Sequence, residues 1–185
     1  MLKFLFTLLI LGPGTLLAQE KSDSDPFRVA LGKVVEETDW PKKAVRIVAV
    51  TYDYTQDRRS PSVVVRDRLH KGVFLISSKL TKEQTKMLYS SITGQHTPWK
   101  PFMCFMPHHG FVFYDETDKI VGSMSLCFQC RAYRAWPQGE LSRHWDLDAL
   151  KKLLLELKMP FHKNDNAYTA AFDRYLAAQP EKPIK

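Results

Sequence analysis

Short apolar runs rich in β-branched and aromatic residues follow the polar stretch at 19–26. Residues 44–54, AVRIVAVTYDY, alternate weakly between apolar and polar side chains, which predicts a β-strand. Residues 62–65 and 73–76 predict two further short strands, and the polar segment 56–61 predicts a turn. This part of the chain is therefore expected to supply strands to a sheet.

The clearest hairpin pattern lies in residues 110–114 and 119–127, with the acidic segment DETD between them as the turn. If Tyr114 pairs with Lys119, alternation along the two strands gathers apolar side chains on one face. These side chains belong to Phe111, Phe113, Ile120, Met124 and Leu126. We expect that face to point into the core and the opposite, more polar face to point away from it.

A helix is predicted over 81–92, before the hairpin. Thr81 and Gln84 form a T-x-x-Q capping box at its start, and Gly94 is expected to end it. After the hairpin, residues 131–144 contain Pro137 and Gly139 and are predicted to be irregular.

Two more helices are predicted near the end of the chain. Asp146 caps the first, over 147–158, where leucines keep helical spacing until Pro160 stops the helix. The second is expected to begin after Asn164 or Asn166. Its apolar stripe is typical of a core face and comprises Tyr168, Phe172, Tyr175 and Leu176.

The order of elements is strands, helix, hairpin and two helices, without regular strand–helix–strand alternation. This order predicts an α+β fold, with a small, mainly antiparallel sheet, a central hairpin and about three helices packed on it. Residues 27–178 are expected to form this single domain. Residues 19–26 and 179–185 are expected to be a flexible start and a flexible tail.

The first eighteen residues have the pattern of a signal peptide. Lys3 precedes the apolar stretch 4–11, a Gly-Pro-Gly segment follows, and Ala18 offers a cleavage position. An uncleaved anchor or a buried segment is the alternative interpretation. No later apolar stretch is long enough to span a membrane. We therefore expect a secreted or periplasmic protein that is cleaved near Ala18.

Charge argues against nucleic acid as a partner. The chain of 185 residues carries 27 Lys and Arg against 20 Asp and Glu, for a net charge of +7. These basic residues are scattered along the sequence, whereas nucleic-acid binders concentrate them on one element. The net positive charge is compatible with unspecific attraction to anionic components of a cell envelope, and it identifies no particular partner.

Three cysteines, Cys104, Cys127 and Cys130, carry the distinctive chemistry of the sequence. The predicted hairpin register places Cys104 opposite Gln129, between the other two, so all three sulfurs are expected to meet. An odd number of cysteines in an exported protein leaves one thiol unpaired. One interpretation is therefore a disulfide, either from Cys104 to one of the pair or between Cys127 and Cys130.

A metal site is the second interpretation of the cysteine cluster. His108 falls on the same strand face as Cys127, so Cys104, His108, Cys127 and Cys130 form a ligand set that suits tetrahedral zinc. A redox-active C-x-x-C is the third. It is disfavoured because a strand, and not the start of a helix, is predicted next to Cys127.

The cysteine segments also resemble a family motif. Residues 104–115, CFMPHHGFVFYD, followed by LCFQC at 126–130, are similar to C-x-x-P-[RH]-[HN]-[GA]-[IF]-x-F and I-C-F-x-C in exported bacterial proteins of unknown function. The resemblance extends over roughly residues 80–160. It implies export, and it implies no activity.

No catalytic signature accompanies the cysteines. The sequence lacks G-x-S-x-G, H-E-x-x-H, a Walker A loop and a Rossmann fingerprint. We therefore expect a small, exported, non-catalytic domain with a cysteine-rich hairpin end. The alternative is an exported thiol-disulfide oxidoreductase or a zinc-dependent protein acting through Cys127 and Cys130.

Overall fold

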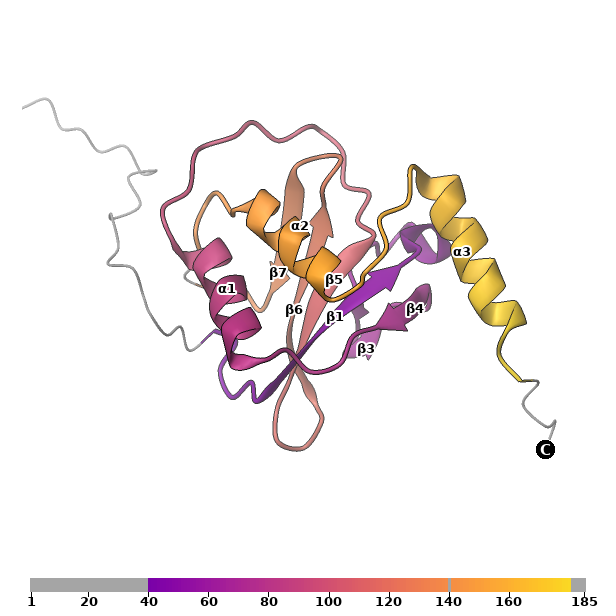
Figure 1. Cartoon of the computed structure of the whole chain (residues 1–185), viewed down its shortest axis with the longest axis horizontal. Helices are drawn as coiled ribbons and strands as arrows, with labels where there is room; N and C mark the ends of the chain where they lie inside the picture. Colours follow the sequence, from indigo (N-terminus) through magenta and orange to yellow (C-terminus); the bar gives the residue numbers. More distant parts are fainter. Residues whose placement is uncertain (1–39, 140, 181–185) are drawn as a thin grey trace, which may run out of the picture. The chain divides into compact units, whose positions relative to one another are not determined.

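A five-stranded antiparallel sheet organises the structure, which is a computed structural model (Figure 1). Its strands run in the order β4-β1-β5-β6-β7, so β5 is central. Their bounds are Arg46–Tyr52 for β1, Val73–Ile76 for β4, His109–Tyr114 for β5, Ile120–Cys127 for β6 and Ala132–Trp136 for β7. With the helices described below, this sheet confirms the predicted α+β fold.

The structure describes residues 40–139 and 141–180, which belong to one structural unit. The predicted signal peptide at 1–18 and the segment 19–26 lie outside the described residues, as does most of the predicted tail. In the described part of the chain, no helix is long and apolar enough to cross a membrane.

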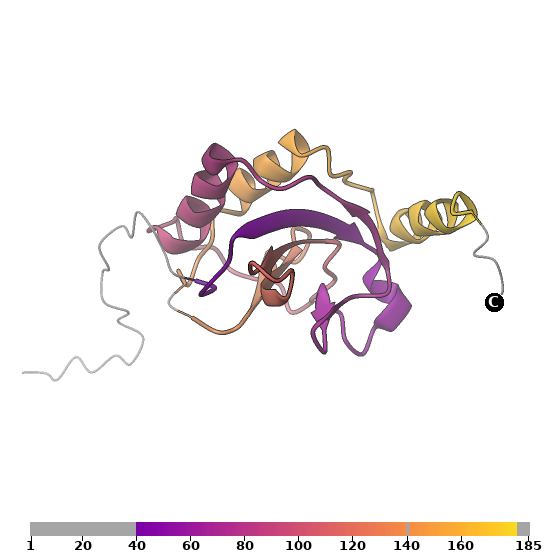
Figure 2. The ribbon, with the colours of Figure 1, turned by 90° about the horizontal axis from the view of Figure 1, so that it is seen from below.

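The core lies between the sheet and two helices on one of its faces (Figure 2). Helix α1 is Lys82–Thr93 and helix α2 is Leu147–Glu156, and the two pack against each other. The predicted capping box of Thr81 and Gln84 is present, and Asp146 caps α2 as expected. From the sheet, the core takes the apolar face predicted for the hairpin, including Phe111, Phe113, Met124 and Leu126.

The opposite face of the sheet carries a second, smaller core. The 3-10 helix η1, Tyr54–Asp57, and the short strands β2, Val64–Val65, and β3, Arg68–Leu69, lie on this side (Figure 2). Its buried side chains include Val48, Val50, Tyr52, Val63 and Val112. Because both faces are covered, β1 and β5 are almost completely buried, which explains their nearly continuous apolar sequences.

The hairpin register differs from the predicted one by up to two residues. Tyr114 pairs with Ile120, not Lys119, and Phe113 pairs with Gly122 after a local irregularity. The cause is the turn, in which the Asp115 carboxylate accepts hydrogen bonds from the backbone N–H groups of Thr117 and Lys119. A shift of two residues leaves each side chain on its predicted face, so the core prediction survives the error.

Segment 131–144 was predicted to be irregular, and this prediction is wrong for its first part. Residues 132–136 form strand β7, which pairs with β6 from Ala132 opposite Cys127 to Trp136 opposite Ser123. The strand has few β-branched residues and lies at the edge of the sheet. Its sequence therefore lacks the strong pattern of a buried strand.

The last helix, α3, spans Asp165–Ala177, with Asn164 as its N-cap. Only the first half of its predicted core stripe is buried, because Tyr175 is 38% exposed and Leu176 is 51% exposed. The helix packs against the four-residue strand β4 and continues past this edge of the sheet (Figure 2). In its second half, Phe172 and Tyr175 contact Phe74 of β4, at 6.3 and 6.4 Å between ring centroids, and Leu176 lies exposed beyond the edge of the sheet.

The two faces of α2 predict opposite responses to truncation. Leu153 is fully buried between α2 and the sheet, whereas Leu155 on the same helix is 54% exposed. Leu153→Ala should cost about 2–5 kcal/mol of unfolding free energy, because it leaves a cavity. The matched control Leu155→Ala should cost less than about 1 kcal/mol. Urea unfolding measures both, and equal losses would contradict this packing.

Candidate functional site

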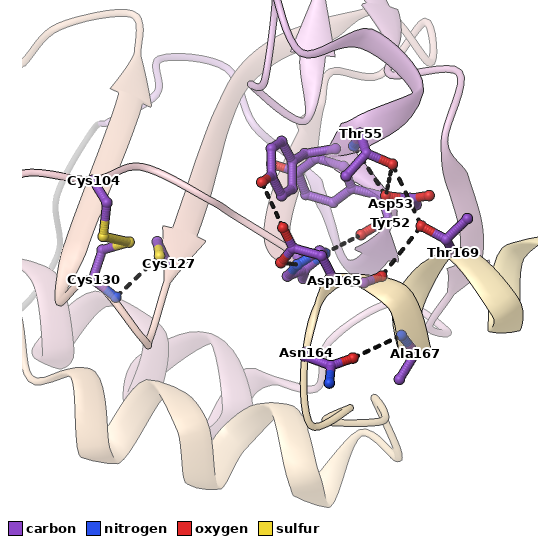
Figure 3. A network of polar contacts seen from close by, with 12 residues as sticks. Tyr52, Asp53, Thr55, Cys104, Cys127, Cys130, Asn164, Asp165, Ala167 and Thr169 are labelled. Carbon is purple, nitrogen blue, oxygen red and sulfur yellow. Dashed lines mark hydrogen bonds and ion pairs between the residues drawn. A yellow bond between two sulfur atoms is a disulfide. The ribbon is translucent and has the colours of Figure 1, made fainter.

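The three cysteines meet where β6 turns into β7 (Figure 3). A disulfide joins Cys104 to Cys130, with a sulfur–sulfur distance of 2.06 Å and a Cα–Cα distance of 5.6 Å. Beside it, the backbone N–H of Phe102 donates to the Cys130 carbonyl over 2.9 Å. The predicted convergence is thus confirmed, as is the interpretation that Cys104 bonds to one of the pair and leaves one free thiol.

Local sequence explains why the pair can receive Cys104. Strand β6 ends at Cys127, and Arg131 adopts a left-handed backbone with φ of 48°, so the chain reverses within a few residues. In this turn the backbone N–H of Cys130 donates to the Cys127 sulfur over 3.1 Å. Cys104 arrives on the segment between α1 and β5, which has no regular secondary structure. The disulfide therefore ties an irregular segment to the sheet.

The free thiol of Cys127 is in a poor position to react. Its residue is 1% exposed, and burial raises the pKa of the thiol above its usual value. The thiolate is the nucleophilic form of cysteine, so a buried thiol with a raised pKa remains protonated and unreactive at neutral pH.

The four predicted metal ligands are not used together. Cys104 and Cys130 are in the disulfide, and both ring nitrogens of His108 face other residues. Within residues 40–139 and 141–180, no group of three or more His, Cys, Asp or Glu side chains is arranged to hold a metal ion. A zinc site of Cys104, His108, Cys127 and Cys130 stays a prediction for a reduced chain.

His108 instead anchors α3 to the sheet. Its Nδ1 lies 3.1 Å from the Tyr52 carbonyl oxygen and its Nε2 lies 3.1 Å from Oδ1 of Asp165, the first residue of α3. The ring therefore connects the end of β1 to the start of α3. The Tyr54 hydroxyl donates to the other Asp165 oxygen over 2.8 Å, and Tyr168 stacks on the imidazole at 3.6 Å between ring centroids.

We call Tyr54, His108, Asp165 and Tyr168 the His108 cluster. Figure 3 shows Asp165 at the start of α3, close to the η1 segment and apart from the cysteines. Sequence reasoning missed the carboxylate, because Asp165 looks like an ordinary first-turn acid after the Asn164 cap. The partners of its carboxylate come from η1 and from the residue before β5, and no local pattern connects them.

His109 points to the opposite side of the sheet from His108. Its Nε2 donates to the Pro160 carbonyl over 2.9 Å, and its ring stacks on Phe161 at 4.1 Å. Burial lowers the pKa of this imidazole to about 3. His109 is therefore a neutral core residue, which excludes it from acid–base chemistry near neutral pH.

No protein family, curated protein or solved structure is significantly similar to this chain. The functional argument therefore depends on the residues and their geometry.

Buried neutral His109 predicts a loss of stability in mild acid. An unfolded histidine has a pKa of about 6.5. Below about pH 6.5, His109 is therefore protonated in the unfolded chain and remains neutral in the folded chain. Stability should be complete above that pH and fall by about 1.4 kcal/mol per pH unit as the pH decreases toward the folded pKa. Burial also lowers the pKa values of His70 and His162, which act in the same direction.

Urea unfolding at about pH 7 and about pH 5 measures this difference. In His109→Gln, whose amide can still donate to Pro160, the difference between the two pH values should shrink by about 2 kcal/mol. The matched control is His96→Gln, because the His96 ring makes only an exposed contact with the Ser90 carbonyl. An unchanged pH dependence in His109→Gln would contradict the assignment.

The His108 cluster predicts that α3 depends on one carboxylate. Asp165→Asn removes the charge that faces His108 and should weaken docking of α3 by about 1–3 kcal/mol. Asp173→Asn, an exposed change on the same helix, is the control. Amide hydrogen exchange over 165–177 should accelerate in the first variant and not in the second. Equal protection of α3 in both variants would contradict the anchoring role.

Proposed function

We propose that the chain is an exported, non-catalytic domain whose irregular segment between α1 and β5 is fixed to the sheet by the Cys104–Cys130 disulfide. The observation that carries the proposal is this closed disulfide beside a buried third thiol. Disulfides persist in oxidising compartments and are rare in the cytosol. The signal-peptide pattern of residues 1–18 supports the same conclusion.

The disulfide attaches a segment that has no regular secondary structure to the sheet. The segment from Gly94 to His108 contributes no strand or helix, so few backbone hydrogen bonds hold it. The bond joins two residues that are 26 positions apart in the sequence. It therefore lowers the conformational entropy of the unfolded chain between Cys104 and Cys130. Such a bond typically contributes about 2–5 kcal/mol of stability.

Thiol-disulfide exchange is the alternative, and the geometry is unfavourable to it. An attacking thiol needs exposure and a lowered pKa, whereas Cys127 is buried and its pKa is raised. Cys127 also ends a β-strand, so no helix N-terminus stabilises its thiolate. A scaffold role therefore fits the cysteine cluster better than redox catalysis.

Serine and alanine variants separate the two functions. Cys104→Ser and Cys130→Ser should each lower the melting temperature by about 5–15 °C, because each removes the disulfide. Cys127→Ala should lower it much less, because it removes one buried sulfur and no covalent bond. Thermal melts followed by circular dichroism measure these shifts, and the parent should not accelerate insulin reduction.

Protein recovered from the periplasm or the medium tests export and the pairing together. We expect a mature chain that begins near Gln19, one thiol per chain after denaturation, and no bound zinc. Mass spectrometry, thiol titration and elemental analysis read these properties. Three thiols, stoichiometric zinc, or an intact Met1 in a cytosolic product would contradict the proposal.

A further inference from the structure

A cation-lined cleft lies beside the disulfide. It has a volume of about 700 Å³ and is lined by residues 98–101, 131–133 and 143–144. That volume is within the range of small-ligand pockets. The three segments are distant in sequence, so the cleft exists only in the folded chain.

Positive charge gathers in this cleft. Lys100, Arg131 and Arg143 line it, and none of its described lining residues is Asp or Glu. His144 also lines the cleft, and its Nδ1 atom is buried with no hydrogen-bond partner. A concave site lined by several cationic side chains concentrates anions. The planar fork of Arg matches the oxygens of a phosphate in particular.

Two aromatic rings form rigid walls for the cleft. The Trp99 indole N–H donates to the Trp145 carbonyl over 3.1 Å, and the Tyr133 hydroxyl donates to the Arg143 carbonyl over 2.5 Å. Tyr133 also stacks on Trp145, at 3.6 Å between ring centroids. The guanidinium of Arg131 lies 5.6 Å from the centre of the Trp99 ring. The cation and the aromatic ring are thus adjacent before any ligand binds. This arrangement reduces the side-chain entropy that is lost on binding.

The disulfide holds two walls of the cleft together. Pro101 is three residues before Cys104, and Arg131 directly follows Cys130. The hydrogen bond from the Phe102 N–H to the Cys130 carbonyl adds a second connection between the same segments. The wall carrying Trp99 and Lys100 is therefore fixed relative to the wall carrying Arg131 and Tyr133.

We propose that this cleft binds the phosphate monoester of a ring compound, with the phosphate on the cations and the ring against Trp99 and Tyr133. A monoester carries close to two negative charges at neutral pH, which suits several cations better than a single carboxylate does. The alcohol can be a sugar or an aryl ring, since both present an apolar face to an aromatic wall. This proposal depends on the proposed function in one respect only: the Cys104–Cys130 disulfide joins the two walls of the cleft.

Calorimetric titration of the oxidised protein tests the cleft with four probes: phenyl phosphate, glucose 6-phosphate, inorganic phosphate and glucose. We expect at least one ester to bind more tightly than inorganic phosphate, and glucose not to bind. The tighter of the two esters identifies the ring class. Added salt should weaken ester binding, because charge supplies the attraction.

Charge-matched variants locate the site. Arg131→Gln and Lys100→Gln should each weaken ester binding about tenfold, because each removes one charge-assisted contact. Arg59→Gln removes the same charge from an exposed position outside the cleft and should change the dissociation constant by less than about twofold. Trp99→Ala should abolish the preference for an ester over inorganic phosphate. Unchanged melting temperatures in the two exposed cleft variants exclude misfolding as the cause.

Three outcomes overturn the cleft proposal: no ester binds, inorganic phosphate binds as tightly as both esters, or Arg59→Gln weakens binding as much as Arg131→Gln. A separate experiment tests the role of the disulfide by removing it. Binding should weaken in the Cys104→Ser variant if it remains folded at the assay temperature. Binding that is unaffected by this change would contradict the clamping role of the disulfide and leave the cleft itself confirmed.

Discussion

The pairing of β5 with both of its neighbours is the constraint on which the rest of the structure depends. β5 is the middle strand, and its pairing with β6 brings the segment before it to the turn that follows Cys127. In that turn Cys104 bonds to Cys130, and Cys127 keeps a free thiol. The same pairing directs His108 and His109 to opposite faces of the sheet. A change of this register by one residue would exchange those two roles.

Two adjacent histidines show how completely environment decides chemistry. His109 lies among aromatic rings and a single carbonyl acceptor, and desolvation keeps it neutral. His108 is nearly as buried, yet its Nε2 faces the Asp165 carboxylate and its Nδ1 faces the Tyr52 carbonyl oxygen. The first stabilises the core next to α2, and the second attaches α3. Both rings contact other protein groups through their nitrogen atoms, so both histidines have a structural role.

The disulfide fixes the position of a segment that no strand or helix holds in place. A segment without strands or helices cannot hold functional side chains accurately, because its backbone is free to move. The disulfide attaches the segment that carries Trp99 and Lys100 to the turn before β7. Basic residues that are scattered along the sequence lie together on one concave surface of the folded chain. The lack of a basic cluster in the sequence argues against nucleic acid as a partner, and it says nothing against a small anion.

Local patterns were sufficient for the fold class, for the two capped helices α1 and α2, and for the apolar face of the hairpin. Each depends on residues close in sequence, such as the Thr81–Gln84 capping box. The convergence of the cysteines also followed from the hairpin alone. Tertiary structure decided which sulfur Cys104 joins, because a turn with left-handed Arg131 determines which cysteine is presented. It also decided the Asp165–His108 pair, the β7 edge strand and the cleft, since their partners come from distant segments and only packing brings them together.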